Sequence, residues 1–181
     1  LGIEIGKTGE VIVDEYMRTS LESVWAIGDV TNKNPLAHVA SSQGLVVAAN
    51  IAGKCENMDY TAVPSAIFTN PEVASVGISE RQAKDNGIQV KVGRFPFLAC
   101  GKAVSMNETL GFVKVIADLQ GKVVGAQIVG PHASDLISEV TLAISNGLSI
   151  EQVVKTIHTH PTLSESVYEA CEDILGLAVN I

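Results

Sequence analysis

The sequence predicts an α+β fold, an antiparallel sheet with helices packed against it, and two observations carry this prediction. Apolar-rich runs at 111–117 and 122–129 lie on either side of a short polar turn, which indicates a β-hairpin. The stretches 79–82 and 149–152 each place a serine three residues before a glutamine, the pattern of a helix capping box. Hairpins and capped helices in one region favour antiparallel strands covered by helices.

This pattern begins at about residue 61, so we expect one domain at 61–181. Two short strands separated by a proline-containing turn are expected within 63–77, and alternating apolar residues from Ile88 predict a strand that ends near Pro96 at a sheet edge. After the hairpin, Pro131 suits the first turn of a helix that stops at Gly147. A last helix follows, with an apolar stripe made of Val167, Cys171, Ile174 and Leu175.

Residues 1–53 form a separate segment in this interpretation. The apolar run from Val24 to Ile27 is suited to a buried parallel strand, with Asp29 at its carboxyl end. Ligands of open α/β sheets bind at such ends, where a carboxylate can accept hydrogen bonds from sugar hydroxyls. The simpler alternative is that Asp29 only opens a turn.

A helix rich in Ala and Ser is expected from about residue 36 to 52, ending at Gly53. Its first turn, at Leu36, Ala37 and His38, presents backbone N–H groups and a partial positive charge. Such a turn can stabilise negative charge on a ligand.

Composition narrows the classes of partner. The net charge of −8, from 12 Lys and Arg against 20 Asp and Glu, argues against a nucleic-acid partner. No apolar run reaches membrane length, so no membrane association is expected. The three cysteines have no disulfide framework spacing, which favours a reducing, cytoplasmic setting. We expect Cys171 to be a buried thiol and Cys100 to lie in a loop between strands.

The stretch from His158 to Glu165 carries the strongest candidate chemistry. Pro161 favours a turn, which leaves the His160 imidazole on a loop and Glu165 in the first turn of the next helix. An imidazole oriented by a carboxylate can act as a general base near neutral pH. Two alternatives stay open: a capping box with Thr162 as N-cap and Glu165 as its partner, and a metal site at the histidines, for which further ligands at regular spacing are missing. We expect no metal.

The run His158-Thr159-His160-Pro161-Thr162-Leu163-Ser164-Glu165 resembles the active-site signature of the dihydrolipoamide dehydrogenases, which are class I pyridine nucleotide-disulfide oxidoreductases. The segment from Thr19 to Asp29 is similar to the second flavin-binding motif of that superfamily. The segment from Val63 to Gly77 resembles the one that opens its dimerisation domain. Glutathione reductases usually have a second glutamate where Ser166 stands here, and mercuric reductases generally lack this histidine.

The resemblance implies that residues 1–53 are the end of an FAD-binding α/β domain and that residues 61–181 form a homodimer's dimerisation domain. It implies that Asp29 and the backbone of Leu36, Ala37 and His38 contact FAD. It also implies that His160, held by Glu165, accepts the thiol proton of dihydrolipoamide at the partner subunit's flavin and disulfide, with NAD+ as the final oxidant. The substrate would be carried by 2-oxo acid dehydrogenase or glycine cleavage complexes.

The sequence has no G-x-G-x-x-G loop, and its cysteines are too far apart for the family's redox pair. We therefore expect the C-terminal part of a larger enzyme, inactive alone and with no bound FAD or NAD. Two other functions stay open: the same region of a glutathione- or mercuric-reductase-like flavoprotein, and a dimerisation module without chemistry.

Overall fold

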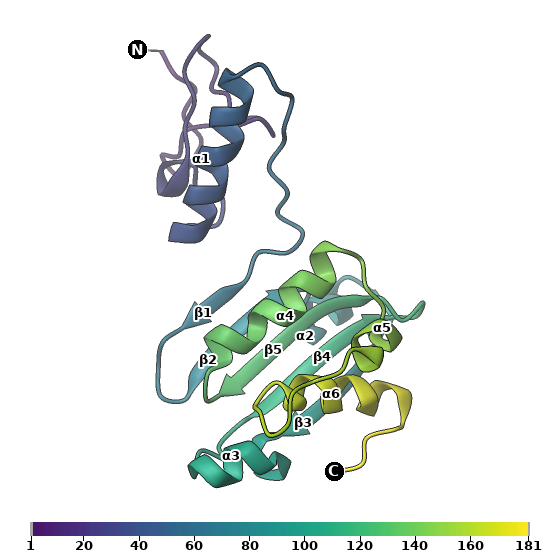
Figure 1. Ribbon diagram of the computed structural model, residues 1–181. Helices are drawn as coiled ribbons and strands as arrows, with labels where there is room; N and C mark the ends of the chain where they lie inside the picture. The colour runs from purple at the N-terminus through teal and green to yellow at the C-terminus, as the bar shows by residue number, and fades with distance from the viewer. Residues whose placement is uncertain (1, 181) are drawn as a thin grey trace. The chain divides into compact units, whose positions relative to one another are not determined.

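The computed structural model describes residues 2–180, which divide into two compact units at Tyr60 and Thr61 (Figure 1). The larger unit is built on a five-stranded sheet in which all neighbouring strands are antiparallel, in the order β1-β2-β5-β4-β3. The strands are β1 (Ser65–Ile67), β2 (Glu72–Gly77), β3 (Val90–Pro96), β4 (Phe112–Asp118) and β5 (Val123–Gly130).

The predicted hairpin is confirmed as β4 and β5, with bounds shifted by one residue. The predicted edge strand is β3, which ends at Pro96 on the outside of the sheet. An edge position tolerates proline because the missing N–H is not needed for a ladder on both sides. Both predicted capping boxes are present: Ser79 begins α2 (Glu80–Asp85) and Ser149 begins α5 (Ile150–Lys155).

Two longer helices cover one face of this sheet (Figure 1). Helix α4 (Ala133–Ser145) packs on β2 and β5, and helix α6 (Glu165–Leu175) packs on β3 and β4. Helix α6 comes very close to β3, because a Cβ built at Gly93 would lie 2.0 Å from the carbonyl oxygen of Ala170. A glycine at this position therefore sets how closely the helix sits on the sheet.

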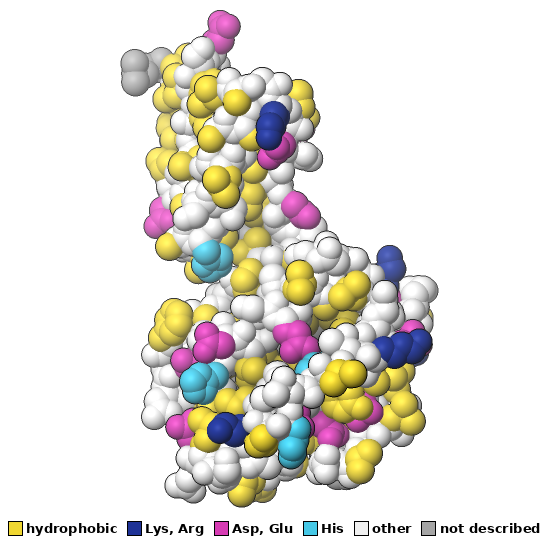
Figure 2. Space-filling view, in the orientation of Figure 1, with side chains coloured by type: hydrophobic (Ala, Val, Ile, Leu, Met, Phe, Trp, Pro, Cys, Tyr) yellow, Lys and Arg dark blue, Asp and Glu magenta, His cyan; other side chains and the backbone are white. Residues whose placement is uncertain are grey.

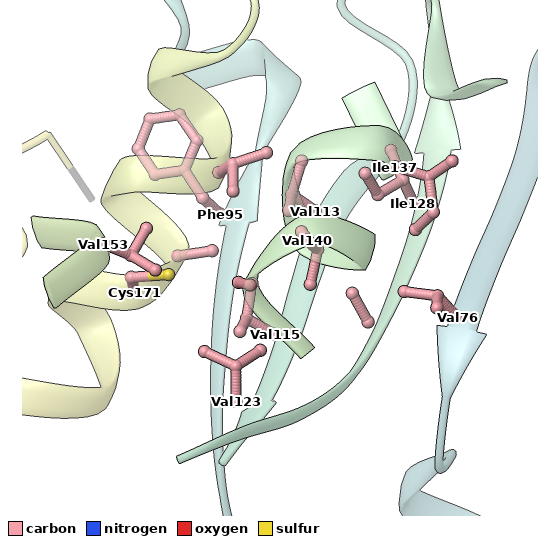
Figure 3. Close-up of a cluster of buried hydrophobic side chains, with 14 of the residues drawn as sticks. Val76, Phe95, Val113, Val115, Val123, Ile128, Ile137, Val140, Val153 and Cys171 are labelled. Atoms are coloured by element: carbon pink, nitrogen blue, oxygen red, sulfur yellow. The ribbon is translucent and has the colours of Figure 1, made fainter. Parts of the chain in front are cut away.

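The hydrophobic core of the larger unit lies between the sheet and these helices (Figure 3). Figure 3 shows Val113 and Val115 of β4 pointing toward the helices, with Cys171 of α6 beside Val153 of α5. Cys171 is 1% exposed, which confirms the prediction of a buried thiol. Helix α6 is thus fixed on its inner side, while its first turn carries Glu165.

One local prediction in this unit is incomplete and another is wrong. Cys100 lies in the connection between β3 and β4, as predicted, but it is buried there and is the N-cap of α3 (Gly101–Met106), which follows the short 3-10 helix η2 (Phe97–Ala99). A helix of six residues is too short to show a clear apolar period. Helix α4 begins at Ala133, so Pro131 precedes it, and its N-cap His132 has a left-handed backbone (φ 54).

The smaller unit contains a 3-10 helix, η1 (Gly28–Thr31), and one α-helix, α1 (Ala37–Ile51). The predicted strand at 24–27 is wrong: only Trp25 forms a bridge, antiparallel to Arg18, and Val24 and Ile27 are 37% and 40% exposed. A parallel strand needs neighbouring strands for its hydrogen bonds. Within residues 2–60 only isolated bridges occur, the other joining Ile5 and Val11.

Hydrophobic side chains reach the surface of both units (Figure 2). In the larger unit the most exposed ones include Phe68 and Ile157, at 79% and 97%. Exposed apolar groups of this size are available for contacts with other protein surfaces. No helix among residues 2–180 has both the length and the apolar character needed to cross a bilayer.

Candidate active site: the His160 and Glu165 pair

The loop between α5 and α6 brings His160 and Glu165 together. The Nδ1 atom of His160 lies 2.9 Å from Oε1 of Glu165, and the His160–Pro161 peptide bond is cis. The His160 side chain is 79% exposed, whereas that of Glu165 is 29% exposed. The imidazole therefore stands in solvent while its carboxylate partner is held at the start of a packed helix.

The second oxygen of Glu165 is also engaged. Its Oε2 accepts a hydrogen bond of 2.8 Å from the backbone N–H of Thr162. One carboxylate thus makes the backbone contact of a capping box and the imidazole contact of a base pair, so these two interpretations are not exclusive. Thr162 is not the N-cap, however: that residue is Ser164, and the Thr162 hydroxyl donates to the carbonyl oxygen of Thr159 at 2.7 Å.

These hydrogen bonds determine the charge of Glu165. Burial opposes its ionisation, but the Thr162 N–H and the His160 imidazole stabilise the carboxylate and hold the pKa of Glu165 below its ordinary value. An ionised carboxylate accepts a hydrogen from Nδ1, so Nε2 is the basic nitrogen of the neutral ring. The pair can take up a proton at Nε2 and stabilise the resulting imidazolium.

A second histidine and glutamate pair lies beside the first. Nε2 of His158 lies 2.7 Å from Oε1 of Glu139 on α4, and its Nδ1 lies 2.8 Å from the carbonyl oxygen of Thr156. The His158 side chain is only 9% exposed, and its ring centroid is 5.3 Å from that of Tyr168. Glu139 was not foreseen from the sequence, because nothing local links it to a residue 19 positions away.

The metal interpretation of this loop finds no support in its geometry. The two histidines face different carboxylates, and no group of three or more His, Cys, Asp or Glu side chains in residues 2–180 could hold a metal ion. Cys171 is buried, and burial together with the charge of Glu139 raises the pKa of its thiol to about 12. Such a thiol is a poor nucleophile.

In the smaller unit, Asp29 lies in η1 with its side chain exposed. The loop before it is closed by Thr19, whose hydroxyl donates to the carbonyl oxygen of Val24 at 2.9 Å. The backbone N–H of Gly28 donates to the side-chain oxygen of Gln43 at 2.6 Å. Gln43 is fully buried and fixes the Gly28-Asp29 step to α1. Gln43 was not predicted from the sequence, although a glutamine one helical turn after Val39 lies on the same face of the helix and could have indicated a buried side chain.

Leu36 is the N-cap of α1, with an extended backbone, and Ala37 and His38 are the first two helical residues. No side chain caps this end of the helix. The carbonyl oxygen of Leu36 accepts from Val39 and Ala40, each at 3.0 Å, so the intrahelical bonds start beyond the first two residues. The Leu36 N–H itself donates to the carbonyl oxygen of Asn34 at 2.7 Å. What this end offers an anionic group is the partial positive charge of the first turn of a helix.

Two family models match this chain, one in each of the two units. Residues 63–171 match the model for the pyridine nucleotide-disulphide oxidoreductase dimerisation domain, and residues 1–44 match the pyridine nucleotide-disulphide oxidoreductase model. A dihydrolipoyl dehydrogenase of Chlamydia muridarum is 53% identical over 91% of this chain and 36% of its own length. That of Geobacillus stearothermophilus is 46% identical over 100% of this chain and 39% of its own length.

The chain therefore spans less than two fifths of the length of these curated relatives. Among solved structures, LpdA from Mycobacterium tuberculosis aligns with a TM-score of 0.89 at 29% identity, covering 95% of this chain and 38% of that one. The flavoprotein disulfide reductase RclA from Escherichia coli aligns with a TM-score of 0.87 at 28% identity, covering 94% and 40%. The chain belongs to the pyridine nucleotide-disulphide oxidoreductase family, and residues 63–171 are its dimerisation domain.

Proposed function

We propose that this chain is the C-terminal region of a dihydrolipoamide dehydrogenase, an enzyme that oxidises dihydrolipoamide with NAD+ through FAD and a redox disulfide. In this proposal it supplies the homodimer contact and the proton-transferring histidine. The observation that carries the proposal is the hydrogen bond between His160 and Glu165 on an exposed loop of a dimerisation domain. The similarity to dihydrolipoyl dehydrogenases at about half identity favours this substrate over others.

His160 acts on the substrate thiol. A thiolate, and not a thiol, attacks a disulfide, so a base that removes the thiol proton near neutral pH speeds the exchange. The Nε2 of His160 takes that proton, and Glu165 stabilises the positive ring through Nδ1. General-base assistance of this kind contributes about 10²–10⁴ in rate. In the dimer, this histidine serves the disulfide of the partner subunit.

The residues of the smaller unit fit an FAD molecule. The exposed carboxylate of Asp29 can accept hydrogen bonds from ribityl hydroxyls, and the uncapped first turn at Leu36, Ala37 and His38 can face the electron-rich edge of the flavin ring. When bound, FAD supplies a two-electron carrier between a disulfide and NAD+. This chain's contribution is to hold and polarise one edge of that group.

The remaining partners belong to the same proposal. The expected substrate is dihydrolipoamide carried by 2-oxo acid dehydrogenase or glycine cleavage complexes. We place the enzyme in the cytoplasm, with a role in cell redox homeostasis. The three cysteines are unpaired, as a reducing compartment would keep them.

A hybrid enzyme tests the proposal directly. This chain would replace the matching region of the Geobacillus stearothermophilus dihydrolipoyl dehydrogenase, to which it is 46% identical. We expect a flavin-containing dimer that reduces NAD+ with dihydrolipoamide. His160→Gln should lower kcat by about 10²–10⁴. His132→Gln is the matched control, because His132 is also exposed and pairs with Asp135 at 3.2 Å. A hybrid that folds, binds FAD and shows no turnover would contradict the proposal.

A second candidate function is favoured by the structural match to RclA, an HOCl-induced flavoprotein disulfide reductase. In that case the substrate is another disulfide. The same hybrid should be assayed for NADPH oxidation with glutathione disulfide. Activity in this assay that exceeds activity with dihydrolipoamide would favour the second candidate. Full activity of His160→Gln in both assays would mean that this chain contributes dimerisation and no chemistry.

A further inference from the structure

The loop that carries His160 is anchored on its inner side by a pair of residues that the reaction itself does not use. His158 points into the domain, where its side chain is 9% exposed, whereas the side chain of His160 is 79% exposed. Each histidine contacts a carboxylate on a different helix: Glu139 on α4 for the inner one and Glu165 on α6 for the outer one. The loop is thus tied to two helices through two adjacent imidazoles.

Both ring nitrogens of His158 face acceptors. Nδ1 faces the backbone carbonyl of Thr156 at 2.8 Å, and Nε2 faces Glu139 at 2.7 Å. A backbone carbonyl can only accept, so Nδ1 carries a hydrogen. The remaining contact is then held by a hydrogen between Nε2 and the Glu139 carboxyl group. These two short bonds fix the position and the rotation of the ring, and with them the backbone two residues before His160.

The surroundings of this pair are packed. The Tyr168 ring lies 5.3 Å from the His158 ring, and its hydroxyl donates to Glu172 at 2.6 Å, so it is itself held in place. On the other side of the loop, the Sγ atom of Cys100 lies 3.5 Å from the carbonyl oxygen of Thr162. The segment between His158 and Thr162 is therefore braced at both ends, and His160 extends from its middle.

We propose that Glu139 is a positioning residue for His160: through its hydrogen bond to His158, it holds the loop in the conformation in which His160 meets Glu165. This inference rests on the proposed function for its kinetic consequence. Its structural consequence, the position of His160 relative to Glu165, does not depend on the proposed function, because it can be measured in the 181-residue chain itself. A base displaced by about 1 Å can lose about 10²-fold in rate, which sets the scale of the expected effect.

Three variants of the hybrid enzyme test the kinetic consequence. Glu139→Ala removes the acceptor, and we expect kcat to fall by about 10- to 100-fold while KM for dihydrolipoamide changes by less than about threefold. Glu139→Gln keeps an oxygen acceptor at the same place and should recover most of kcat. Asp135→Ala is the matched control, because Asp135 is a carboxylate on the same helix that pairs with His132 outside the loop. Its kcat should equal that of the unmodified hybrid.

Side-chain ¹⁵N NMR of the histidines in the 181-residue chain tests the structural consequence. In the unmodified chain we expect His160 to show one dominant tautomer, with hydrogen on Nδ1. Glu139→Ala should mix its tautomers, and Asp135→Ala should not. An unchanged His160 signal or an unchanged kcat in Glu139→Ala would overturn the proposal, as would Glu139→Gln being as impaired as Glu139→Ala. If the proposed function is wrong, the unmodified hybrid will be inactive, while Glu139→Ala will still mix the His160 tautomers in the NMR experiment.

Discussion

At the residue scale, the two oxygens of Glu165 connect acid stability to the candidate site. Its pKa is held below the ordinary value of 4.5 because the folded state stabilises the carboxylate against the opposing effect of burial. A lowered pKa in the folded state contributes stability that is present above the unfolded pKa and is lost as pH falls through the folded one. Both contacts of Glu165 therefore weaken together in acid.

We expect Glu165→Gln to lower the free energy of unfolding at pH 7 by about 1 kcal/mol, because the charged acceptor of two hydrogen bonds is lost. At an acid pH below the lowered pKa of Glu165, the protonated side chain resembles Gln, and the difference should shrink. Urea unfolding at the two pH values measures it. Glu108→Gln, at an exposed position, serves as the control. An equal difference at both pH values would show that the charge of Glu165 does not matter.

The cysteines should differ sharply in reactivity. Cys55 is exposed, whereas Cys171 is buried and the pKa of its thiol is raised to about 12 by burial and by Glu139. Because the thiolate is the reactive form, an aromatic disulfide reagent at pH 8 should modify Cys55 rapidly and Cys171 only after unfolding. Peptide mass spectrometry identifies the modified residue. Modification of both at similar rates in the folded chain would contradict the assigned burial.

At the element scale, the contact between α6 and β3 depends on Gly93. A Cβ there would lie 2.0 Å from the carbonyl oxygen of Ala170, so Gly93→Ala must push the helix away from the sheet. We expect a loss of about 1–3 kcal/mol in the free energy of unfolding, typical of overpacking. Gly101→Ala is the control, since a Cβ at the first residue of α3 meets nothing within 4 Å. Urea unfolding compares the two, and equal stabilities would show that α6 can shift freely.

Local patterns predicted the elements that local interactions stabilise. The hairpin joins two consecutive strands, β4 and β5, across a short turn, and each capping box at Ser79 and Ser149 lies within a single helical turn; all are present. The strand predicted at 24–27 failed because strand formation depends on neighbours that no local pattern reports.

The candidate site follows the same rule. The contact between His160 and Glu165 spans five positions and was predictable, although its catalytic role stays a prediction. Glu139 and Gln43 contact their partners across 19 and 15 positions. Folding alone brings such residues together, so a single sequence gives no direct signal for either contact.

At the scale of the whole molecule, the proposal divides the enzyme's chemistry between this chain and other parts. In this proposal the smaller unit supplies one edge of an FAD site, at Asp29 and the start of α1, but the sequence has no glycine-rich pyrophosphate loop. We expect the 181-residue chain to hold FAD weakly or not at all after purification and to lack turnover. An absorbance spectrum with a flavin band near-stoichiometric with protein would refute this expectation.

The two units should also differ in stability. The buried hydrophobic cluster lies in the larger unit, whereas Val13, Met17 and Val39 are the buried hydrophobic residues among positions 2–60. A unit with so little buried apolar surface opens more easily. Amide hydrogen exchange should therefore be faster in α1 than in β4.

The buried amide of Gln43 gives this difference a direct test. Its side chain accepts from the Gly28 N–H at 2.6 Å and donates to the Tyr60 hydroxyl at 2.8 Å. Gln43→Ala leaves both groups without this partner, so exchange in α1 should rise by about tenfold or more while β4 is unchanged. Gln120→Ala, in an exposed turn, is the control. If Gln43→Ala accelerated exchange equally in β4, the two units would unfold as one cooperative body, and the division at Tyr60 would have no energetic meaning.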